Sequence, residues 1–242
     1  MFDAESNLYY LYLNSNRLTN ITNSLLKYFI HLLVLKLDSN QIAYIDSDAF
    51  RNLDNLQQLN LANNLISGLD RYLFSTLVQL RYLNLSMNFI EFIDDSFFSQ
   101  LYKLETLDLS FNRIKYIKDF SFVSMSSLID LYINDNQDGL ALYESSLNGL
   151  ESIKNLFISF KTLNQTTNKK SLLYSLKPRQ ENPINGVPYY ASINILYEYG
   201  QPTPQVDCLL VLEFLKHNIQ VNLKTDYQLG VYLSVCQFIE IF

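Results

Sequence analysis

One spacing, 24 residues, recurs through roughly the first two-thirds of the chain and limits its possible folds more than any other feature. Three residue types follow it: leucines at Leu11, Leu35, Leu59, Leu83, Leu107 and Leu131, asparagines at Asn16, Asn40, Asn64, Asn88, Asn112 and Asn136, and phenylalanines at Phe50, Phe74, Phe98 and Phe122. A unit this short cannot enclose a core of its own. The period therefore predicts a solenoid in which each turn packs on its neighbours.

Each turn follows the pattern L-x-x-L-x-L-x-x-N-x-I-x-x-I. Leu107 and Leu109 flank Asp108, and this alternation predicts a short strand with its leucines on one side. One strand per turn, always in the same direction, predicts a parallel sheet. The asparagine of each turn is expected to satisfy backbone groups where the chain leaves the strand. The phenylalanines lie farther along each turn and are expected to stack under the opposite wall.

The pattern resembles the typical 24-residue class of leucine-rich repeats, from Leu8 to about Leu163. The resemblance implies an α/β repeat: a curved, horseshoe-shaped solenoid with the parallel sheet on its concave face. We divide the chain into about seven turns over residues 1–163 and an irregular segment with a C-terminal cap over residues 164–242. The seventh turn, at Leu156, comes one residue late and marks the expected end of the array.

Residues 164–242 lose the period. Residues 177–188 hold three prolines and a glycine and are expected to form a loop, residues 192–199 are a candidate strand, and residues 207–215 are a candidate helix. The two cysteines, Cys208 and Cys236, are similar to half of the four-cysteine cap that closes extracellular leucine-rich repeats. That resemblance implies a disulfide between them, and two buried free thiols are the alternative.

The concave face is expected to bind ligands because the outward residues of the strands line it. The candidate binding residues are Tyr10, Tyr12, Tyr82, Asp108, Asp130, Tyr132 and Phe157. Tyr132 is expected to lie among carboxylates and other aromatic side chains, the composition of a protein-binding hot spot. The acidic residues favour a partner with a basic patch. The alternative is that these residues are ordinary solvated strand positions in a tyrosine-rich chain.

Charge and length argue against other ligands. The chain has 18 Lys and Arg against 24 Asp and Glu, a net charge of −6, so nucleic acid and anionic membrane surfaces are disfavoured as partners. No run of apolar residues reaches the 18 or more that a spanning helix needs. The chain contains no nucleophile-elbow, zinc-protease, P-loop or dinucleotide-binding motif, and its two histidines and two cysteines lack zinc spacing. We therefore expect no catalysis, no metal and no cofactor.

The sequence leaves the cellular location of the protein open. The chain enters its first repeat at Leu8 with no basic or apolar leader before it, so it is either cytosolic or a fragment. Of three N-glycosylation sequons, Asn20 and Asn164 are the plausible acceptors, because a glycan on Asn84 would obstruct the concave face. We expect a receptor ectodomain or secreted recognition protein, outside the cell or on its surface. The alternatives are a cytosolic adaptor or a matrix protein.

Overall fold

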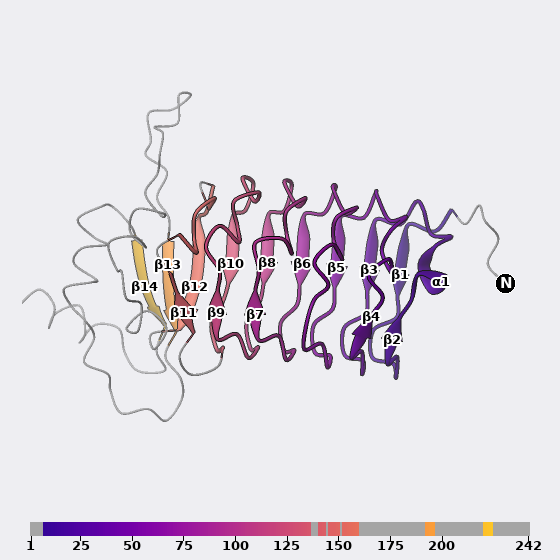
Figure 1. Cartoon of the computed structure of the whole chain (residues 1–242), viewed down its shortest axis with the longest axis horizontal. Helices are drawn as coiled ribbons and strands as arrows, with labels where there is room; N and C mark the ends of the chain where they lie inside the picture. Colours follow the sequence, from indigo (N-terminus) through magenta and orange to yellow (C-terminus); the bar gives the residue numbers. More distant parts are fainter. Residues whose placement is uncertain are drawn as a thin grey trace, which may run out of the picture.

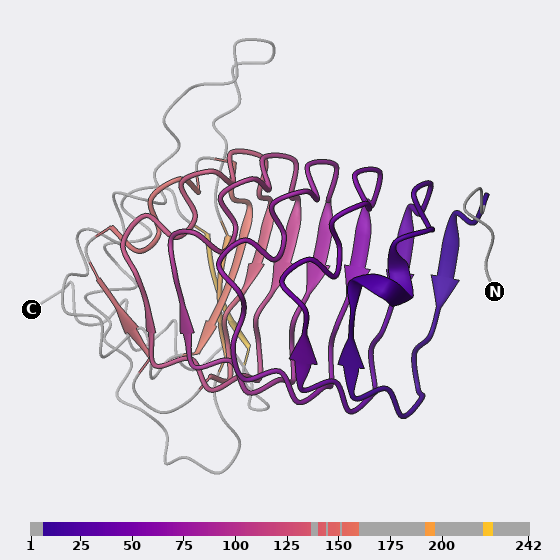
Figure 2. The same ribbon diagram turned by 45° about the vertical axis from the view of Figure 1, so that its right-hand side comes forward.

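The computed structural model describes residues 7–136, 140–143, 145–150, 152–159, 192–196 and 220–224, and it shows a coil of stacked turns (Figures 1 and 2). Its elements are β1 (Tyr10–Tyr12), β2 (Asn20–Ile21), α1 (Asn23–Leu26), β3 (Val34–Lys36), β4 (Tyr44–Ile45), β5 (Gln58–Asn60), β6 (Tyr82–Asn84), β7 (Phe92–Ile93), β8 (Thr106–Asp108), β9 (Tyr116–Ile117), β10 (Asp130–Tyr132), β11 (Ala141–Leu142), β12 (Asn155–Ser159), β13 (Ser192–Leu196) and β14 (Gln220–Lys224).

Nine strands form one parallel sheet in the order β1-β3-β5-β6-β8-β10-β12-β13-β14. Equivalent residues of successive turns are paired, so that Leu83 lies beside Leu59 and Leu107. The late seventh turn keeps this register, because Leu156 pairs with Leu131 despite the 25-residue step. The sheet forms the concave side of the solenoid, and the predicted fold is confirmed.

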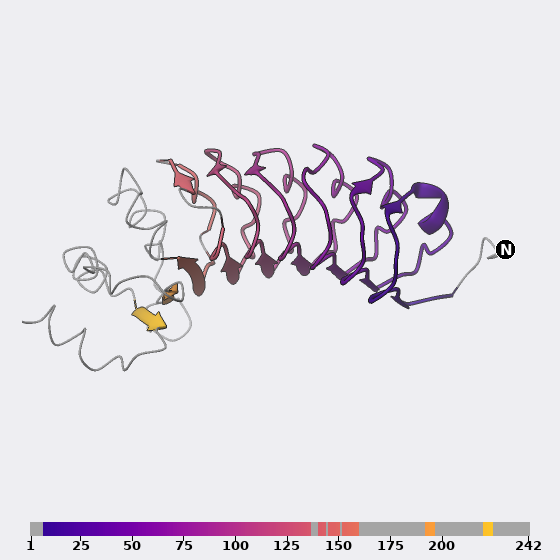
Figure 3. The ribbon, with the colours of Figure 1, turned by 90° about the horizontal axis from the view of Figure 1, so that it is seen from below.

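The returning segments on the opposite side are turns and very short strands (Figure 3). There β7, β9 and β11 form one small parallel sheet, and β2 pairs with β4. Among the described residues, helix is confined to the four residues of α1, next to the first turn. Because the returning segments are nearly as narrow as the strands, the turns stack closely on both sides of the coil.

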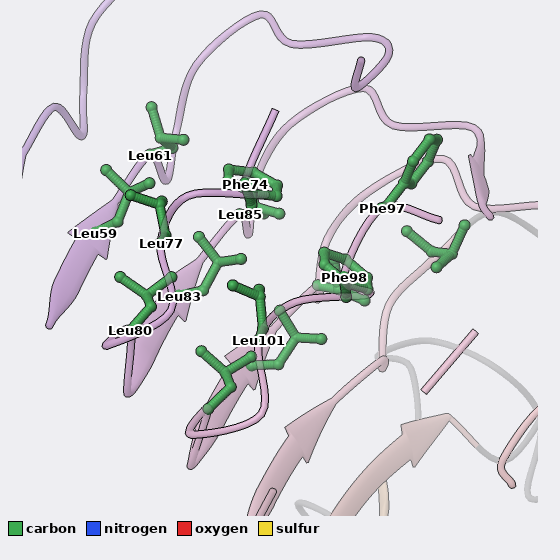
Figure 4. Close-up of a cluster of buried hydrophobic side chains, with 14 of the residues drawn as sticks. Leu59, Leu61, Phe74, Leu77, Leu80, Leu83, Leu85, Phe97, Phe98 and Leu101 are labelled. Atoms are coloured by element: carbon green, nitrogen blue, oxygen red, sulfur yellow. The ribbon is translucent and has the colours of Figure 1, made fainter. Parts of the chain in front are cut away.

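Leucines fill the space between the two walls. Leu59, Leu61, Leu83 and Leu85 point inward from the sheet and are fully buried (Figure 4). Other leucines from the segments between the strands, including Leu77, Leu80 and Leu101, fill the rest of the core. Each turn thus buries its leucines against those of its neighbours, as the 24-residue period predicts.

The four phenylalanines of the period form a stacked spine. Adjacent rings lie 6.2 Å apart between Phe50 and Phe74, 6.3 Å between Phe74 and Phe98, and 6.5 Å between Phe98 and Phe122, with interplanar angles of at most 14°. All four are at most 1% exposed. This arrangement confirms the expectation that the phenylalanines stack.

The asparagines form a ladder of amides that bridge neighbouring turns. The Asn88 Nδ2 donates hydrogen bonds to the carbonyl of Leu61 in the preceding turn and to those of Leu85 and Ser86 in its own. The Oδ1 atom of Asn88 accepts from the Ile66 amide. The same pattern recurs at the ladder positions Asn40, Asn64, Asn112 and Asn136. Each internal asparagine therefore satisfies backbone groups of two turns, as expected from its amide chemistry.

The sheet extends beyond the seventh turn. The candidate strand at residues 192–199 is confirmed in part as β13, which pairs with β12 and places Ile193 beside Leu156. A further strand that sequence analysis missed, β14, places Val221 beside Ile193. These strands lie 37 and 28 residues after their predecessors, counted from Leu156 to Ile193 to Val221, so a fixed 24-residue period cannot detect them. The loop expected at 177–188 and the helix expected at 207–215 lie outside the described residues.

One glycine is required by the packing of two turns. Gly149 has a φ of +97°, and a methyl group there would overlap the backbone of Phe122 and Val123. We therefore expect Gly149→Ala to reduce the free energy of unfolding by about 2–4 kcal/mol, from backbone strain and overpacking. Gly68→Ala is the matched control, since a methyl group there meets no atom within 4 Å. Urea unfolding of both variants measures the difference, and equal stabilities would contradict the assigned packing.

Candidate functional site

The non-core residues of the first seven strands of the nine-stranded sheet, β1, β3, β5, β6, β8, β10 and β12, form a surface that we call the sheet face. Its residues lie in two rows that run across the strands, because each strand contributes one residue before and one after its inward leucine. The first row is Tyr10, Val34, Gln58, Tyr82, Thr106, Asp130 and Asn155, and the second is Tyr12, Lys36, Asn60, Asn84, Asp108, Tyr132 and Phe157.

The N-terminal end of the sheet face is open and mixed in character. Tyr10 and Tyr12 are 56% and 58% exposed, and the Lys36 ammonium lies 5.2 Å from the ring centroid of Tyr12. A shallow hollow of about 200 Å³ follows, lined by residues of β3 and β5 and by Tyr82. The Tyr82 hydroxyl accepts a hydrogen bond from the Asn84 amide, which fixes its ring at the border of this hollow.

The second row begins as a ladder of short polar side chains that serve the backbone. Asn60, Asn84 and Asp108 each accept a hydrogen bond from the main-chain amide two residues later, at 3.1, 2.8 and 2.9 Å. Asp108 also accepts from the Ser110 hydroxyl at 2.6 Å. These contacts explain Asn or Asp at three successive second-row positions as a structural requirement of the strand end.

In the next two turns the second-row residue is no longer Asn or Asp, so the ladder of polar side chains ends. Tyr132 and Phe157 occupy the equivalent positions, and their rings stack with centroids 4.2 Å apart at an angle of 6°. Tyr132 cannot accept the hydrogen bond that Asp108 accepts. In the part of the chain that the structure describes, the buried Oδ1 of Asn134 has no hydrogen-bond partner. The aromatic pair thus takes the place of the polar ladder and places two stacked rings on the sheet face.

Two carboxylates lie beside this aromatic pair without cationic partners. Asp108 is beside Tyr132 in the register, and Asp130 precedes Tyr132 on β10 and accepts a hydrogen bond from the Asn155 amide at 2.7 Å. Three ion pairs among the described residues join a cation to a carboxylate one turn away, as Lys115 is joined to Glu91 at 2.8 Å. Among the described residues, neither Asp108 nor Asp130 forms an ion pair.

The titration of Tyr132 reflects these surroundings. Burial raises the pKa of the Tyr132 hydroxyl above its ordinary value, and the charges of Asp130 and Asp108 raise it further. All three groups are partly buried. The charges of Asp130 and Asp108, which add to the effect of burial on this hydroxyl, would attract a cationic ligand. We call Tyr82, Asp108, Asp130, Tyr132 and Phe157 the aromatic–acidic patch.

The structure places all seven candidate binding residues on the sheet face, but in two groups. Five form the aromatic–acidic patch, whereas Tyr10 and Tyr12 lie at the other end, on β1. Asn20 is exposed on β2, outside the nine-stranded sheet. Cys208, Cys236 and Asn164, together with the disulfide and the glycan expected there, lie outside the described residues.

Sequence analysis missed one exposed apolar residue in the turn after β6, Met87. Met87 and Phe111 are 53% and 49% exposed and have φ values of +54°, a backbone region that bulky residues rarely adopt. The signal was available in the sequence, since both residues precede a ladder asparagine and share the 24-residue step with Ser15, Ser39, Asn63 and Asp135, all of positive φ. Large apolar side chains thus occupy strained, solvent-facing positions in the turns after β6 and β8.

Metal-binding clusters and membrane-spanning helices are absent from the described part of the chain. No group of three or more His, Cys, Asp or Glu side chains there is placed to hold a metal ion. No helix in the same residues has the length and apolar character needed to cross a membrane. The chemistry that the sheet face offers is therefore aromatic stacking, hydrogen bonding and attraction of positive charge.

The repeats match a known protein family. A family model described as leucine rich repeat matches residues 6–66, 30–90, 78–137 and 102–165. A search of curated proteins finds no match.

Solved structures share the fold. A chain of the TLR13-ssRNA13 complex matches 89% of this chain at 25% identity with a TM-score of 0.67. The APL1 leucine-rich repeat domain matches 64% at 26% identity with a TM-score of 0.58, and a chain of the LRIM1/APL1C complex matches 75% at 22% identity with a TM-score of 0.56. This chain spans only 29%, 40% and 29% of their respective lengths.

Proposed function

The chain belongs to the leucine-rich-repeat family, and from this membership we propose that it is a non-catalytic binding module that holds a protein partner on its concave sheet face. The observation that carries the proposal is the replacement of the polar ladder by the stacked pair Tyr132 and Phe157. Tyrosine and other aromatic residues dominate the binding energy of protein interfaces, especially where charged residues adjoin them.

The charge of the patch favours a basic partner. Asp108 and Asp130 are partly buried and form no ion pair with the residues that the structure describes, so a partner's Lys or Arg can pair with them without displacing a described ion pair. RNA is the alternative ligand class, because one structural neighbour comes from a complex with single-stranded RNA. A net charge of −6 and the two carboxylates oppose a polyanion on this face.

The finer proposal is a receptor ectodomain or secreted protein. The resemblance to the typical 24-residue class supports it, and so does the exposed sequon asparagine Asn20. A cytosolic adaptor and a matrix protein are the competing functions. Peptide mapping without reduction distinguishes the receptor or secreted protein from the cytosolic adaptor, because a bond between Cys208 and Cys236 requires an oxidising compartment. Self-association without any partner would favour the matrix protein.

The binding proposal is tested by differential affinity capture with mass spectrometry. The immobilised chain is compared with the double variant Tyr132→Ala/Asp130→Ala, which removes the centre of the patch. We expect the variant to lose at least one abundant partner, because truncating a hot-spot residue costs about 2 kcal/mol or more of binding free energy. Ribonuclease treatment of a parallel sample shows whether RNA bridges the capture.

A matched control removes the same side-chain types elsewhere. Tyr72 is 64% exposed and Asp54 is exposed, and both lie outside the nine-stranded sheet. The variant Tyr72→Ala/Asp54→Ala should retain every partner of the unmodified chain, with an unchanged unfolding midpoint. Partners that survive in the patch variant but vanish in this control would refute binding through the concave face.

A further inference from the structure

The surroundings of β8 point to one kind of side chain on the partner, and this inference rests on the proposed function. Thr106 and Asp108, the two sheet-face residues of β8, are short. The neighbouring strands carry the longer Tyr82 on β6 and Tyr132 on β10. Strands two apart in a sheet are separated by about 10 Å. A planar group above Thr106 and Asp108 would therefore have a tyrosine on each side.

The two faces of the Tyr132 ring differ. Phe157 stacks at 4.2 Å from the β12 side, which leaves the opposite ring face toward β8 and Asp108. Tyr82 is held in place by the hydrogen bond from Asn84 at 3.1 Å. Both aromatic walls are thus fixed by contacts within the protein, which reduces the ordering cost of binding.

Negative charge adjoins this position from two strands. The Oδ1 atoms of Asp108 and Asp130 accept hydrogen bonds from Ser110 and Asn155. Among the described residues, their Oδ2 atoms accept none and no cation pairs with either carboxylate. Lys36, the one cation in the two rows, lies three strands from β8 in the sheet order.

We infer that the surface of β8 between Tyr82 and Tyr132 binds an arginine side chain of the partner, with its guanidinium stacked on Tyr132 and hydrogen-bonded to Asp108 and Asp130. A guanidinium is flat, stacks on aromatic faces and donates in a fork that matches a carboxylate. The lysine ammonium is compact and more strongly hydrated, so it uses the carboxylates but not the aromatic walls. Arginine is therefore preferred over lysine.

The test is a titration of the full chain, labelled with ¹³C in its tyrosine rings, with N-acetyl-arginine amide as the probe. The signals of Tyr132 and Tyr82 are assigned from Tyr→Phe variants. Both signals should shift saturably with the arginine probe and more weakly with N-acetyl-lysine amide. N-acetyl-citrulline amide, which keeps the shape but lacks the charge, should not shift them. Equal shifts with the citrulline probe and the arginine probe would overturn the inference. This comparison requires no protein variant.

Two variants locate the binding charge. Asp108→Asn keeps an oxygen that can accept from Ser110 and should weaken the arginine probe about three- to tenfold. Asp38→Asn is the matched control, since Asp38 is a partly buried carboxylate beside β3 and should leave the affinity unchanged. Equal affinities of wild type and Asp108→Asn would also overturn the inference. A partner captured through the patch without any arginine preference would overturn the inference alone and leave concave-face binding intact.

Discussion

Replacing Asn88 by alanine is expected to lower the free energy of unfolding by about 2–4 kcal/mol, although the side chain is small and polar. Its amide satisfies carbonyls of Leu61, Leu85 and Ser86 and the amide of Ile66, and Asn88 itself is 4% exposed. Alanine leaves the buried Ile66 amide without its acceptor. Each of the three carbonyls loses one of two hydrogen bonds, because Asn64, Asn112 and the Asn63 amide also donate to them. Chemical denaturation followed by circular dichroism measures the loss.

The matched control is the first rung of the same ladder. Asn16 is exposed and donates only to Leu13 and Asn14 of its own turn. Asn16→Ala should therefore change stability by less than about 0.5 kcal/mol. Since stability in a repeat array is a sum of turns and interfaces, Asn88→Ala should also broaden the unfolding transition. Equal effects at Asn88 and Asn16 would contradict the bridging role of the ladder.

Phe98→Ala should destabilise the protein further and lower its free energy of unfolding by about 3–5 kcal/mol. Phe98 is 1% exposed, stacks on Phe74 and Phe122, and meets Phe97 edge-on. Its removal opens a cavity in the middle of the spine that neighbouring turns cannot fill without shifting the register. Thermal unfolding and urea titration should agree on the loss.

An exposed phenylalanine provides the comparison. Phe120 is 51% exposed, so Phe120→Ala should change stability by less than about 0.5 kcal/mol. If Phe98→Ala unfolds at the same urea concentration as Phe120→Ala, the stacked spine does not stabilise the protein.

Periodicity predicted the fold because the same physical need recurs in each turn. Leu107, Asn112 and Phe122 serve the core, the ladder and the spine, and their spacing reports all three. The strands β13 and β14 use the same sheet register after longer intervals, so the period detects neither, and only β13 was expected in part, as the candidate strand at residues 192–199. Gly149 was not predicted to matter, because its contact with Phe122 depends on how two turns approach each other.

The patch was predicted less completely than the fold. Strand alternation placed Asp108, Asp130 and Tyr132 on one face, and the register confirms that Asp108 and Tyr132 are neighbours. The sequence could not show that Asn84 and Asp108 accept backbone hydrogen bonds. It therefore could not show that Tyr132 lacks the hydrogen-bonding role of the equivalent residues in preceding turns. The position of Met87 and Phe111 before ladder asparagines is visible in the sequence, but their positive φ is not, because glycine, the residue that usually marks this conformation, is absent there.

The central claim is that partners bind on the concave sheet face, and photo-crosslinking tests it most directly. A benzoylphenylalanine replaces Thr106, between the two tyrosines of the patch, or Tyr72, which lies outside the sheet. Each chain is irradiated with the partners captured by the unmodified protein. We predict covalent adducts from position 106 and none from position 72. Adducts from position 72 alone would show that partners bind elsewhere and would contradict the account.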